Sequence, residues 1–407
     1  MRKVIFFLIV GFWMMGCDDG SEKWSPNDGG AVENPDEEEQ TVENHLRAKE
    51  MFDLIQAYYK KGNTGLYQES YPAQGNDPEY SYLWPYDGLV SAAVLLTRLG
   101  YEVNYTTLVE GLERYWTEGA NGNSIGGYGS STNGSVGGGT RYYDDNSIVG
   151  ISLVEAYELT KNSDYLQRAG RIVDFLKSGE DDLLGGALWW NEDQKNTIGE
   201  PNSNKPSCAN GYAAQFLLKY YTVCPASEKA EVLAFAKRLY LWLKENLQDP
   251  SDKCYWNDVN ASGTINKTKW TYNTGVMVQN GIALYQITGE QMYLTDAVAA
   301  AQGAYDFFVK TRNGITLTYP DSDPWFNTKL LRAYIDLEPL HKSAADWIKA
   351  YSKFINYGYD NARTSVGFFY EDWTGANAKR YYSLLMQDAV VESYAALALY
   401  KGEKAEL

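Results

Sequence analysis

Two adjacent aspartates, Asp144 and Asp145, stand directly before an apolar run with helical spacing, and Asn146 follows them. A helix start presents free N–H groups and a partial positive charge, which favours ionised carboxylates in the first turn. Asp and Asn are also common helix caps, so the triplet alone favours a structural role. A Gly-rich approach at 137–139 and two tyrosines at 142–143 make a cleft the better interpretation.

Paired carboxylates suit glycoside hydrolysis, which needs one ionised nucleophile and one protonated acid. Successive side chains on a helix diverge by roughly 100°, which leaves neighbouring carboxyl groups several ångströms apart. That separation is compatible with the roughly 5 to 5.5 Å of retaining enzymes. Mutual repulsion and unequal burial would separate the two pKa values. The wider inverting geometry would need a partner from another loop, such as Asp87, Asp258 or Asp372.

Aromatic and amide side chains gather in the loops and helix starts around this motif. Sugar rings present apolar C–H faces that stack on flat side chains, and sugar hydroxyls pair with amides and carboxylates. Ordinary packing, helix capping and core hydrogen bonds are the alternative roles of such residues. We expect the substrate-binding residues among Tyr143, Asn146, Trp84, Asp87, Trp189, Trp190, Asn210, Tyr272, Asn273 and Trp325.

Apolar residues recur at helical spacing in about twelve segments after residue 43. The connections between these segments alternate, short and then mostly long, so that short and long connections lie at opposite ends of the helices. The expected helices lie near 43–61, 83–99, 103–117, 145–160, 163–178, 207–223, 226–248, 272–289, 290–311, 324–338, 341–356 and 383–401.

Each long connection carries a strand-like phrase rich in glycine or aromatic residues. The phrases begin at residues 65, 126, 185, 254, 314 and 367, which are 61, 59, 69, 60 and 53 residues apart. This spacing is that of a helical hairpin. The sequence therefore predicts an all-α fold, an (α/α)6 barrel of six hairpins whose even-numbered helices lie inside. The strand-like loops would form the active-site rim. An open superhelical solenoid is the alternative.

The composition narrows the possible partners. The chain has 407 residues, with 36 Lys and Arg against 53 Asp and Glu, a net charge of −17 that disfavours nucleic acid. With only two histidines and four cysteines, a zinc cluster or His-rich metal centre is not expected. We expect no cofactor and no metal, so catalysis must depend on carboxylates, amides and aromatics.

The first residues read as an export signal. Residues 1–17 comprise Arg2, Lys3 and an apolar run too short to span a bilayer, ending at Cys17. Met14-Met15-Gly16-Cys17 resembles a bacterial lipobox, which implies lipidation of Cys17. Residues 18–43 contain ten acidic residues and one basic residue and are expected to be a disordered tether.

An acidic stretch directly after a lipidated cysteine resembles the export signal of surface-displayed lipoproteins. We therefore expect an outer-membrane lipoprotein on the cell surface, with the periplasmic face as the alternative. Membrane contact would run only through the lipid anchor, and residues 44–407 would form a single catalytic domain.

Four ordered motifs together resemble glycoside hydrolase family 76, over nearly the whole chain after the tether. The motifs are Tyr143-Asp144-Asp145-Asn146, the phrase at 185–190, Lys-Pro-Ser-Cys-Ala-Asn-Gly at 205–211, and Tyr-Asn-Thr-Gly at 272–275 with Leu-Tyr-Gln-Ile-Thr-Gly at 284–289. The resemblance implies an (α/α)6 barrel that hydrolyses α-1,6-mannan with retention, with Asp144 as nucleophile and Asp145 as acid/base. At residues 147–148 and 325–329 the sequence differs from the residues usual in the family, and these differences would affect individual sugar-binding subsites rather than the reaction.

The function expected from the resemblance is a monomeric, retaining endo-α-1,6-mannanase acting on the backbone of fungal-type mannan or on manno-oligosaccharides. One alternative is a non-catalytic surface lipoprotein that binds glycans in the same cleft. Another is a transglycosidase that remodels cell-wall glycans. A polysaccharide lyase is disfavoured, because uronate substrates need a basic cleft and the chain is acidic.

Overall fold

The computed structural model describes residues 43–120, 122–321 and 323–405. The expected signal peptide, the lipidation site Cys17 and nearly all of the tether lie outside these ranges. Within them the helices are α1 (Asn44–Tyr58), α2 (Leu83–Arg98), α3 (Tyr105–Gly111), α4 (Tyr143–Thr160), α5 (Ser163–Lys177), α6 (Ser207–Val223), α7 (Lys229–Asn246), α8 (Thr271–Thr288), α9 (Gln291–Phe308), α10 (Pro324–Leu337), α11 (Ala344–Asn361) and α12 (Leu384–Lys401).

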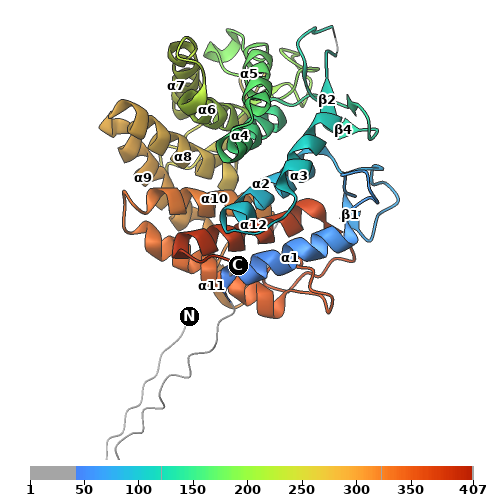
Figure 1. Cartoon of the computed structure of the whole chain (residues 1–407). Coiled ribbons are helices and arrows are strands. Elements are labelled where there is room, and N and C mark those ends of the chain that lie inside the picture. Colours follow the sequence, from blue (N-terminus) through green and yellow to red (C-terminus); the bar gives the residue numbers. More distant parts are fainter. Residues whose placement is uncertain (1–42, 121, 322, 406–407) are drawn as a thin grey trace, which may run out of the picture. The chain divides into compact units, whose positions relative to one another are not determined.

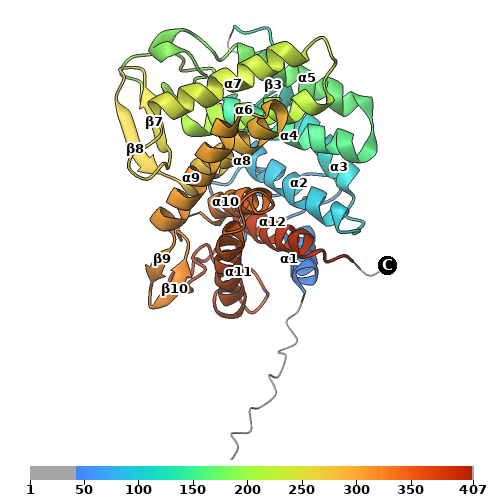
Figure 2. The same cartoon turned by 90° about the vertical axis from the view of Figure 1, so that its left-hand side faces the viewer.

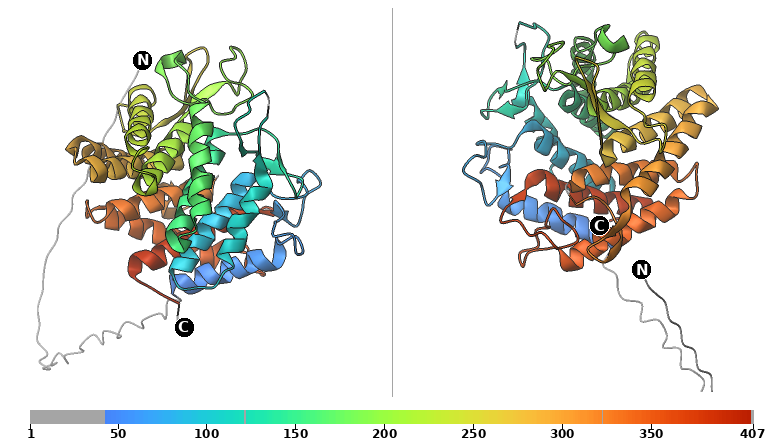
Figure 3. Two further views of the ribbon diagram at one scale, coloured as in Figure 1. Left: turned by 45° about the horizontal axis from the view of Figure 1, so that its top comes forward. Right: turned by 180° about the vertical axis from the view of Figure 1, so that it is seen from behind.

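The even-numbered helices form a closed inner ring. Each packs on the next, from α2 through α4, α6, α8 and α10 to α12, and α12 packs on α2. The odd-numbered helices lie outside them (Figure 1). Helix α1 (blue) lies beside α12 (red), where the first and last hairpins meet (Figure 3). The predicted (α/α)6 barrel is confirmed, and ring closure rules out the open solenoid.

Glycines let the inner helices approach closely. A Cβ atom on Gly150 of α4 would lie 2.6 Å from the Phe216 ring of α6, and one on Gly211 of α6 would lie 2.6 Å from Val276 of α8. Only glycine leaves room for these neighbours. The inner ring is therefore narrow, and it brings the helix starts together.

The connections between helices alternate in length, as predicted. Short turns lead from each inner helix to the next outer helix, and long loops lead back to the start of the following inner helix. The three-stranded sheet β6-β7-β8 joins two of these loops, and its β7 and β8 lie side by side in Figure 2. The strands are β1 (Ser70–Tyr71), β2 (Trp116–Thr117), β3 (Gly127–Tyr128), β4 (Ser131–Thr132), β5 (Gly137–Gly138), β6 (Asn204–Pro206), β7 (Trp256–Asn260), β8 (Ile265–Lys269), β9 (Lys310–Arg312), β10 (Ile315–Thr318) and β11 (Tyr382–Ser383).

The fourth residue of each inner helix holds the preceding loop. The Asn146 side chain accepts from the Tyr128 N–H at 2.7 Å and donates to the Tyr128 carbonyl at 2.9 Å. Asn210 makes the same pair of bonds with Leu188, at 2.7 and 3.0 Å. Buried backbone groups need such partners. These amides therefore fix the strand-like phrases against the helix starts.

The other four inner helices use the same position. Gln387 pairs with both backbone groups of Phe369, and Thr274 accepts from Tyr255. In α2 the Tyr86 hydroxyl donates to the Gly65 carbonyl, and in α10 Asn327 donates to the Pro320 carbonyl. One position of the repeat thus anchors all six long loops in the described chain.

Several helix boundaries differ from prediction by a few residues; α11, for example, ends at Asn361 rather than near 356. The third helix was expected over 103–117, but α3 ends at Gly111 and a 3-10 turn follows over Leu112–Tyr115. Gly111 lies where any side chain would overlap the Tyr86 hydroxyl. Helix α4 begins at Tyr143 rather than near 145, so Asp144 and Asp145 are its second and third residues.

Candidate active site

The second residue of every inner helix faces one cavity of about 750 Å³, which we call the rim cavity. The third residue faces it in four of the six helices. The helix-start residues that line it are Trp84, Pro85, Asp144, Asp145, Cys208, Tyr272, Trp325, Phe326, Leu385 and Met386. The sixfold repeat therefore places the aspartate pair, Asp144 and Asp145, among aromatic side chains from the other hairpins.

Asp144 accepts two hydrogen bonds. The Trp190 indole Nε1 donates to its Oδ2 at 3.1 Å, and the Asp145 backbone N–H donates to its Oδ1 at 3.1 Å. The Cys208 thiol is a third group that favours the charged form of Asp144 and so lowers its pKa. Burial raises the pKa of Asp144, while these donors act in the opposite direction because they favour the charged form.

At Asp145, the surroundings favour the protonated form of the carboxyl group. Burial, the negative charge of Asp144 and then that of Asp87 raise its pKa well above the usual range. Two neighbouring carboxylates cannot both ionise easily, so they share a proton. The hydrogen bonds place that proton on Asp145 and the charge on Asp144, which is the division that general acid and nucleophile need.

Cys208 links Asp144 to α8. Burial, together with the charge of Asp144, raises the pKa of the Cys208 thiol well above the usual range, so it stays protonated and can donate. The neighbouring Tyr272 hydroxyl acts in the opposite direction and lowers the pKa of Cys208. Sequence reasoning had left Cys208 without a function. Cys208 is the second residue of α6, just as Asp144 is the second residue of α4, and this shared position could have indicated that it faces the site. All three cysteines in the described ranges are free thiols.

Aromatic rings form two walls of the rim cavity. On one side Tyr272 stacks on Phe326 with ring centroids 3.9 Å apart, and Phe326 stacks on Trp84 at 5.9 Å. On the other side Tyr142 lies 5.0 Å from Trp190. Flat apolar faces beside carboxylates and amides are the surface that a sugar ring needs.

Loop residues add polar groups that sequence reasoning missed. Glu69, Asp323, Asn204 and Asn257 line the rim cavity. Burial raises the pKa of Asp323 to about 7 and also raises that of Glu69. Their placement depends on the path of each loop, which hydrophobic spacing does not encode.

Of the ten predicted substrate-binding residues, Trp84, Trp190, Tyr272 and Trp325 line the rim cavity with the aspartate pair. Trp189 does not. Neighbours in an extended segment point to opposite sides, and the buried Trp189 indole donates to Asp181 at 2.7 Å instead.

The other five also lie outside the lining of the rim cavity. Asn146 and Asn210 are the loop anchors of their helices, and Tyr143 is buried with its ring stacked on Phe175 at 4.8 Å. Asn273 is buried and donates to Asn257 at 3.4 Å. Asp87 lies deeper. These five residues lie behind the cavity lining and position the helix starts and loops that form it.

Asp87 lines a second cavity of about 540 Å³ inside the barrel. Ile148, Tyr212 and Trp325 contribute to both cavities. Asp87 is 3% exposed, and burial raises its pKa to about 7. Its charge state therefore affects Asp145 from beneath the rim cavity.

No group of three or more His, Cys, Asp or Glu side chains in the described ranges could hold a metal ion. In the same part of the chain, every helix is too short or too polar to cross a bilayer.

An (α/α)6 barrel with a carboxylate pair between aromatic walls has the groups that a glycoside hydrolase needs. The chain belongs to glycosyl hydrolase family 76, whose family model matches residues 44–394. No curated protein sequence matches it significantly.

Solved structures of family members share the fold. The family 76 mannosidase Bt3792 from Bacteroides thetaiotaomicron VPI-5482 is 26% identical with a TM-score of 0.77, over 88% of this chain and 99% of that one. An inactive α-1,6-mannanase variant, GH76A of Salegentibacter sp. HEL1_6, has two consecutive aspartates changed to alanine and is bound to α-1,6-mannotetrose. It is 23% identical with a TM-score of 0.70, over 88% of this chain and 100% of that one. Dfg5 from Chaetomium thermophilum, in complex with glucosamine, is 14% identical with a TM-score of 0.67, over 89% and 91%.

Proposed function

We propose that this glycoside hydrolase is a retaining endo-α-1,6-mannanase that cleaves the backbone of fungal-type α-mannan. Asp144 is the nucleophile and Asp145 is the general acid/base. The observation that carries the proposal is the unequal environment of the two carboxyl groups. Trp190 and the Asp145 backbone both donate hydrogen bonds to the Asp144 carboxylate, whereas burial and the charge of Asp144 raise the pKa of Asp145 and favour its protonated form.

The reaction takes two steps. In the first, the Asp144 carboxylate attacks the anomeric carbon while Asp145 gives its proton to the departing glycosidic oxygen. A covalent glycosyl ester forms on Asp144. In the second, Asp145 removes a proton from water, the water oxygen displaces Asp144 from the anomeric carbon, and the configuration is retained.

The lining of the rim cavity supports a neutral glycan. Among its described residues are four carboxyl groups, Glu69, Asp144, Asp145 and Asp323, and no Lys or Arg. An anionic uronate would meet repulsion there. The α-1,6-mannotetrose bound by the Salegentibacter relative supports α-1,6-linked mannose as the particular glycan.

We also propose that the enzyme is an exported lipoprotein displayed on the cell surface, where large mannans are accessible. Cys17 and the acidic residues 18–43 support this proposal. Protease treatment of intact cells tests it. Digestion of the enzyme in intact cells supports surface display, whereas protection until the outer membrane is opened places it on the periplasmic face.

The proposed activity is tested with Asp144→Asn and Asp145→Asn on debranched α-1,6-mannan. Each substitution should abolish hydrolysis, because the first removes the nucleophile and the second removes the general acid/base. Asp164→Asn is the matched control. Asp164 is also the second residue of a helix, but it lies exposed on outer helix α5.

Full activity of either aspartate-pair variant contradicts the assignment. Binding of mannan without any product from the wild-type protein indicates the non-catalytic glycan binder. Transfer of the mannosyl group to an added oligosaccharide in preference to water indicates the transglycosidase.

A further inference from the structure

The segment entering the aspartate pair runs antiparallel to the segment that follows Trp190. Tyr142 and Asn191 form a β-bridge. The Tyr143 N–H donates to the Trp190 carbonyl at 3.0 Å, and the Glu192 N–H donates to the Arg141 carbonyl at 3.1 Å. Residues 141 and 192 therefore lie directly opposite each other.

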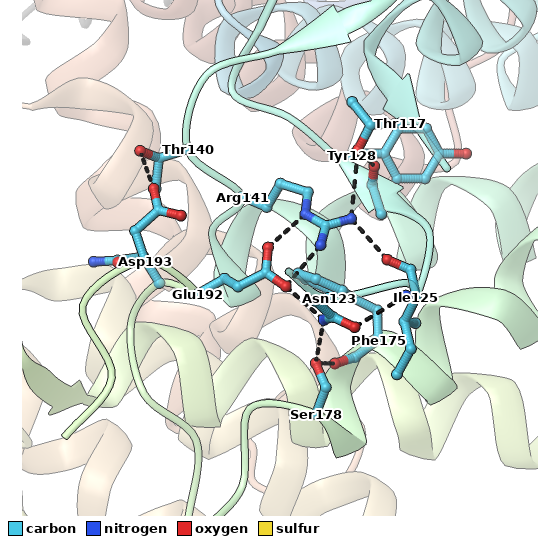
Figure 4. Close-up of polar contacts among 12 residues, drawn as sticks. Thr117, Asn123, Ile125, Tyr128, Thr140, Arg141, Phe175, Ser178, Glu192 and Asp193 are labelled. Atoms are coloured by element: carbon cyan, nitrogen blue, oxygen red, sulfur yellow. Dashed lines mark hydrogen bonds and ion pairs between the residues drawn. The ribbon is translucent and has the colours of Figure 1, made fainter. Parts of the chain in front are cut away.

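A buried ion pair joins these two residues. Arg141 Nε donates to Glu192 Oε2 and Arg141 Nη2 donates to Glu192 Oε1, both at 2.6 Å (Figure 4). Arg141 is 0% exposed and Glu192 is 7% exposed. Two parallel N–H···O bonds from a planar guanidinium fix the relative orientation of both side chains.

A third segment, from the loop before β3, completes the network. Arg141 Nη1 donates to the Ile125 carbonyl at 2.8 Å, and Asn123 Nδ2 donates to Glu192 Oε1 (Figure 4). The guanidinium also lies 5.0 Å from the Phe175 ring, on which Tyr143 stacks. Both charges are thus paired and hydrogen-bonded, as buried charges must be.

We propose that Arg141 and Glu192 are positioning residues of the reaction. Their ion pair keeps the indole N–H of Trp190 within hydrogen-bond distance of the Asp144 carboxylate. The inference rests on the proposed function. Neither residue lines the rim cavity, so neither contacts substrate. They act through the register of residues 141–143 against 190–192, which sets the place of Trp190 relative to Asp144.

Register is the sensitive quantity here. A shift of one residue between paired extended segments turns every side chain to the other face. Trp189 would then replace Trp190 beside the aspartate pair. The pairing of residues 141–143 with 190–192 is short, with a single bridge between the two segments. Asn210 and the Trp190 N–H bond to the Asn204 carbonyl hold the 188–190 segment against α6 and β6. The Arg141–Glu192 ion pair is the side-chain contact that holds it against the segment entering Asp144.

The test uses Arg141→Lys and Glu192→Gln. Lysine keeps the charge but loses the two-pronged geometry, and glutamine keeps the shape but loses the charge. Arg312→Lys is the matched control, because Arg312, in the α9–α10 connection, also donates to backbone carbonyls, those of Thr318 in β10 and of Phe308 at the end of α9.

We expect kcat on α-1,6-mannan to fall by roughly 10- to 100-fold in both variants with KM little changed, since displaced catalytic groups lose rate more than binding. The acidic limb of the kcat/KM profile should move to higher pH, because Asp144 loses a donor to its charged form. The titratable groups that face Asp144 stay unchanged in both variants; they are Asp145, Tyr142, Cys208, Tyr212 and Tyr272. Arg312→Lys should move neither quantity.

A double-mutant cycle with Trp190→Phe separates positioning from stability. If the ion pair acts through Trp190, Arg141→Lys and Glu192→Gln should shift the acidic limb no further once Trp190 is replaced. Additive shifts, or profiles equal to that of Arg312→Lys, overturn the inference while leaving the mannanase assignment intact. Wild-type protein without Asp144-dependent hydrolysis overturns the proposed function itself.

Discussion

The indole nitrogen of Trp190 donates a hydrogen bond to Oδ2 of Asp144 across 3.1 Å. Asp144 is in the first turn of α4, and Trp190 is in the loop between α5 and α6, so two successive hairpins meet at this contact. The same tryptophan forms an aromatic wall of the rim cavity with Tyr142. In the mechanism that we propose, this one side chain would both stack on substrate and control the charge of the nucleophile.

Trp190→Phe keeps an aromatic ring and removes the donor. Hydrogen bonds to charged groups contribute about 1.5–3 kcal/mol, so kcat should fall by roughly tenfold or more. The pKa of Asp144 should rise, which moves the acidic limb of the pH–rate profile upward. Initial rates on α-1,6-mannan between pH 4 and 8 check this expectation. An unshifted acidic limb would show that the indole N–H has no influence on the nucleophile.

Cys208→Ala and Cys208→Ser form a matched pair. The alanine variant removes the thiol that favours the charged form of Asp144, and we expect a severalfold loss of kcat/KM. Serine supplies an O–H donor at nearly the same place, so it should retain most of the activity. Equal losses in both variants would point to packing against Tyr272 rather than to a polar effect on Asp144.

The second and fourth positions of the inner helices should behave differently on substitution. Trp84→Ala, at a second position, removes a wall of the rim cavity and should raise KM by more than roughly fivefold. Asn210→Ala, at a fourth position, leaves two buried backbone groups of Leu188 unpaired. Its cost should be about 2–4 kcal/mol of unfolding free energy. Denaturant unfolding and KM measured on both variants test the distinction, and the reverse pattern contradicts it.

Asp87→Asn should stabilise the protein more at high pH than at low pH. The pKa of Asp87 is raised to about 7 by burial, whereas an unfolded Asp ionises near 3.9. Between these values the unfolded state binds fewer protons, so wild-type stability falls as pH rises toward 7. The amide removes this cost, on the order of a few kcal/mol.

Thermal melting of wild type and Asp87→Asn at pH 5 and pH 8 measures the effect. The melting temperature of the variant should exceed that of wild type by more at pH 8. An equal difference at both pH values would show that Asp87 is ionised throughout this range.

Helix positions were predictable because apolar spacing and loop length are local signals. The alternation of short and long connections sufficed to assign inner and outer helices, as the closed ring from α2 to α12 confirms. Asp144 stood out for the same reason, since carboxylates at a helix start are visible in the sequence.

Contacts between loops were not predictable. Arg141 and Glu192 are 51 residues apart, and nothing local indicates that they pair. The choice between Trp189 and Trp190 depends on which face of an extended segment meets Asp144. The position of Cys208 in the site could be recognised only by comparing equivalent positions of the six inner helices, and that comparison requires the exact first residue of each helix.

We propose that Asp144 and Asp145 cleave α-1,6-mannan by a double displacement. The decisive measurement is proton NMR of the products, recorded within minutes of mixing enzyme with linear α-1,6-mannan and before mutarotation. Internal cleavage with retention should give α-anomeric reducing ends on oligosaccharides of several lengths. A β-anomer as the first product would contradict the covalent role of Asp144.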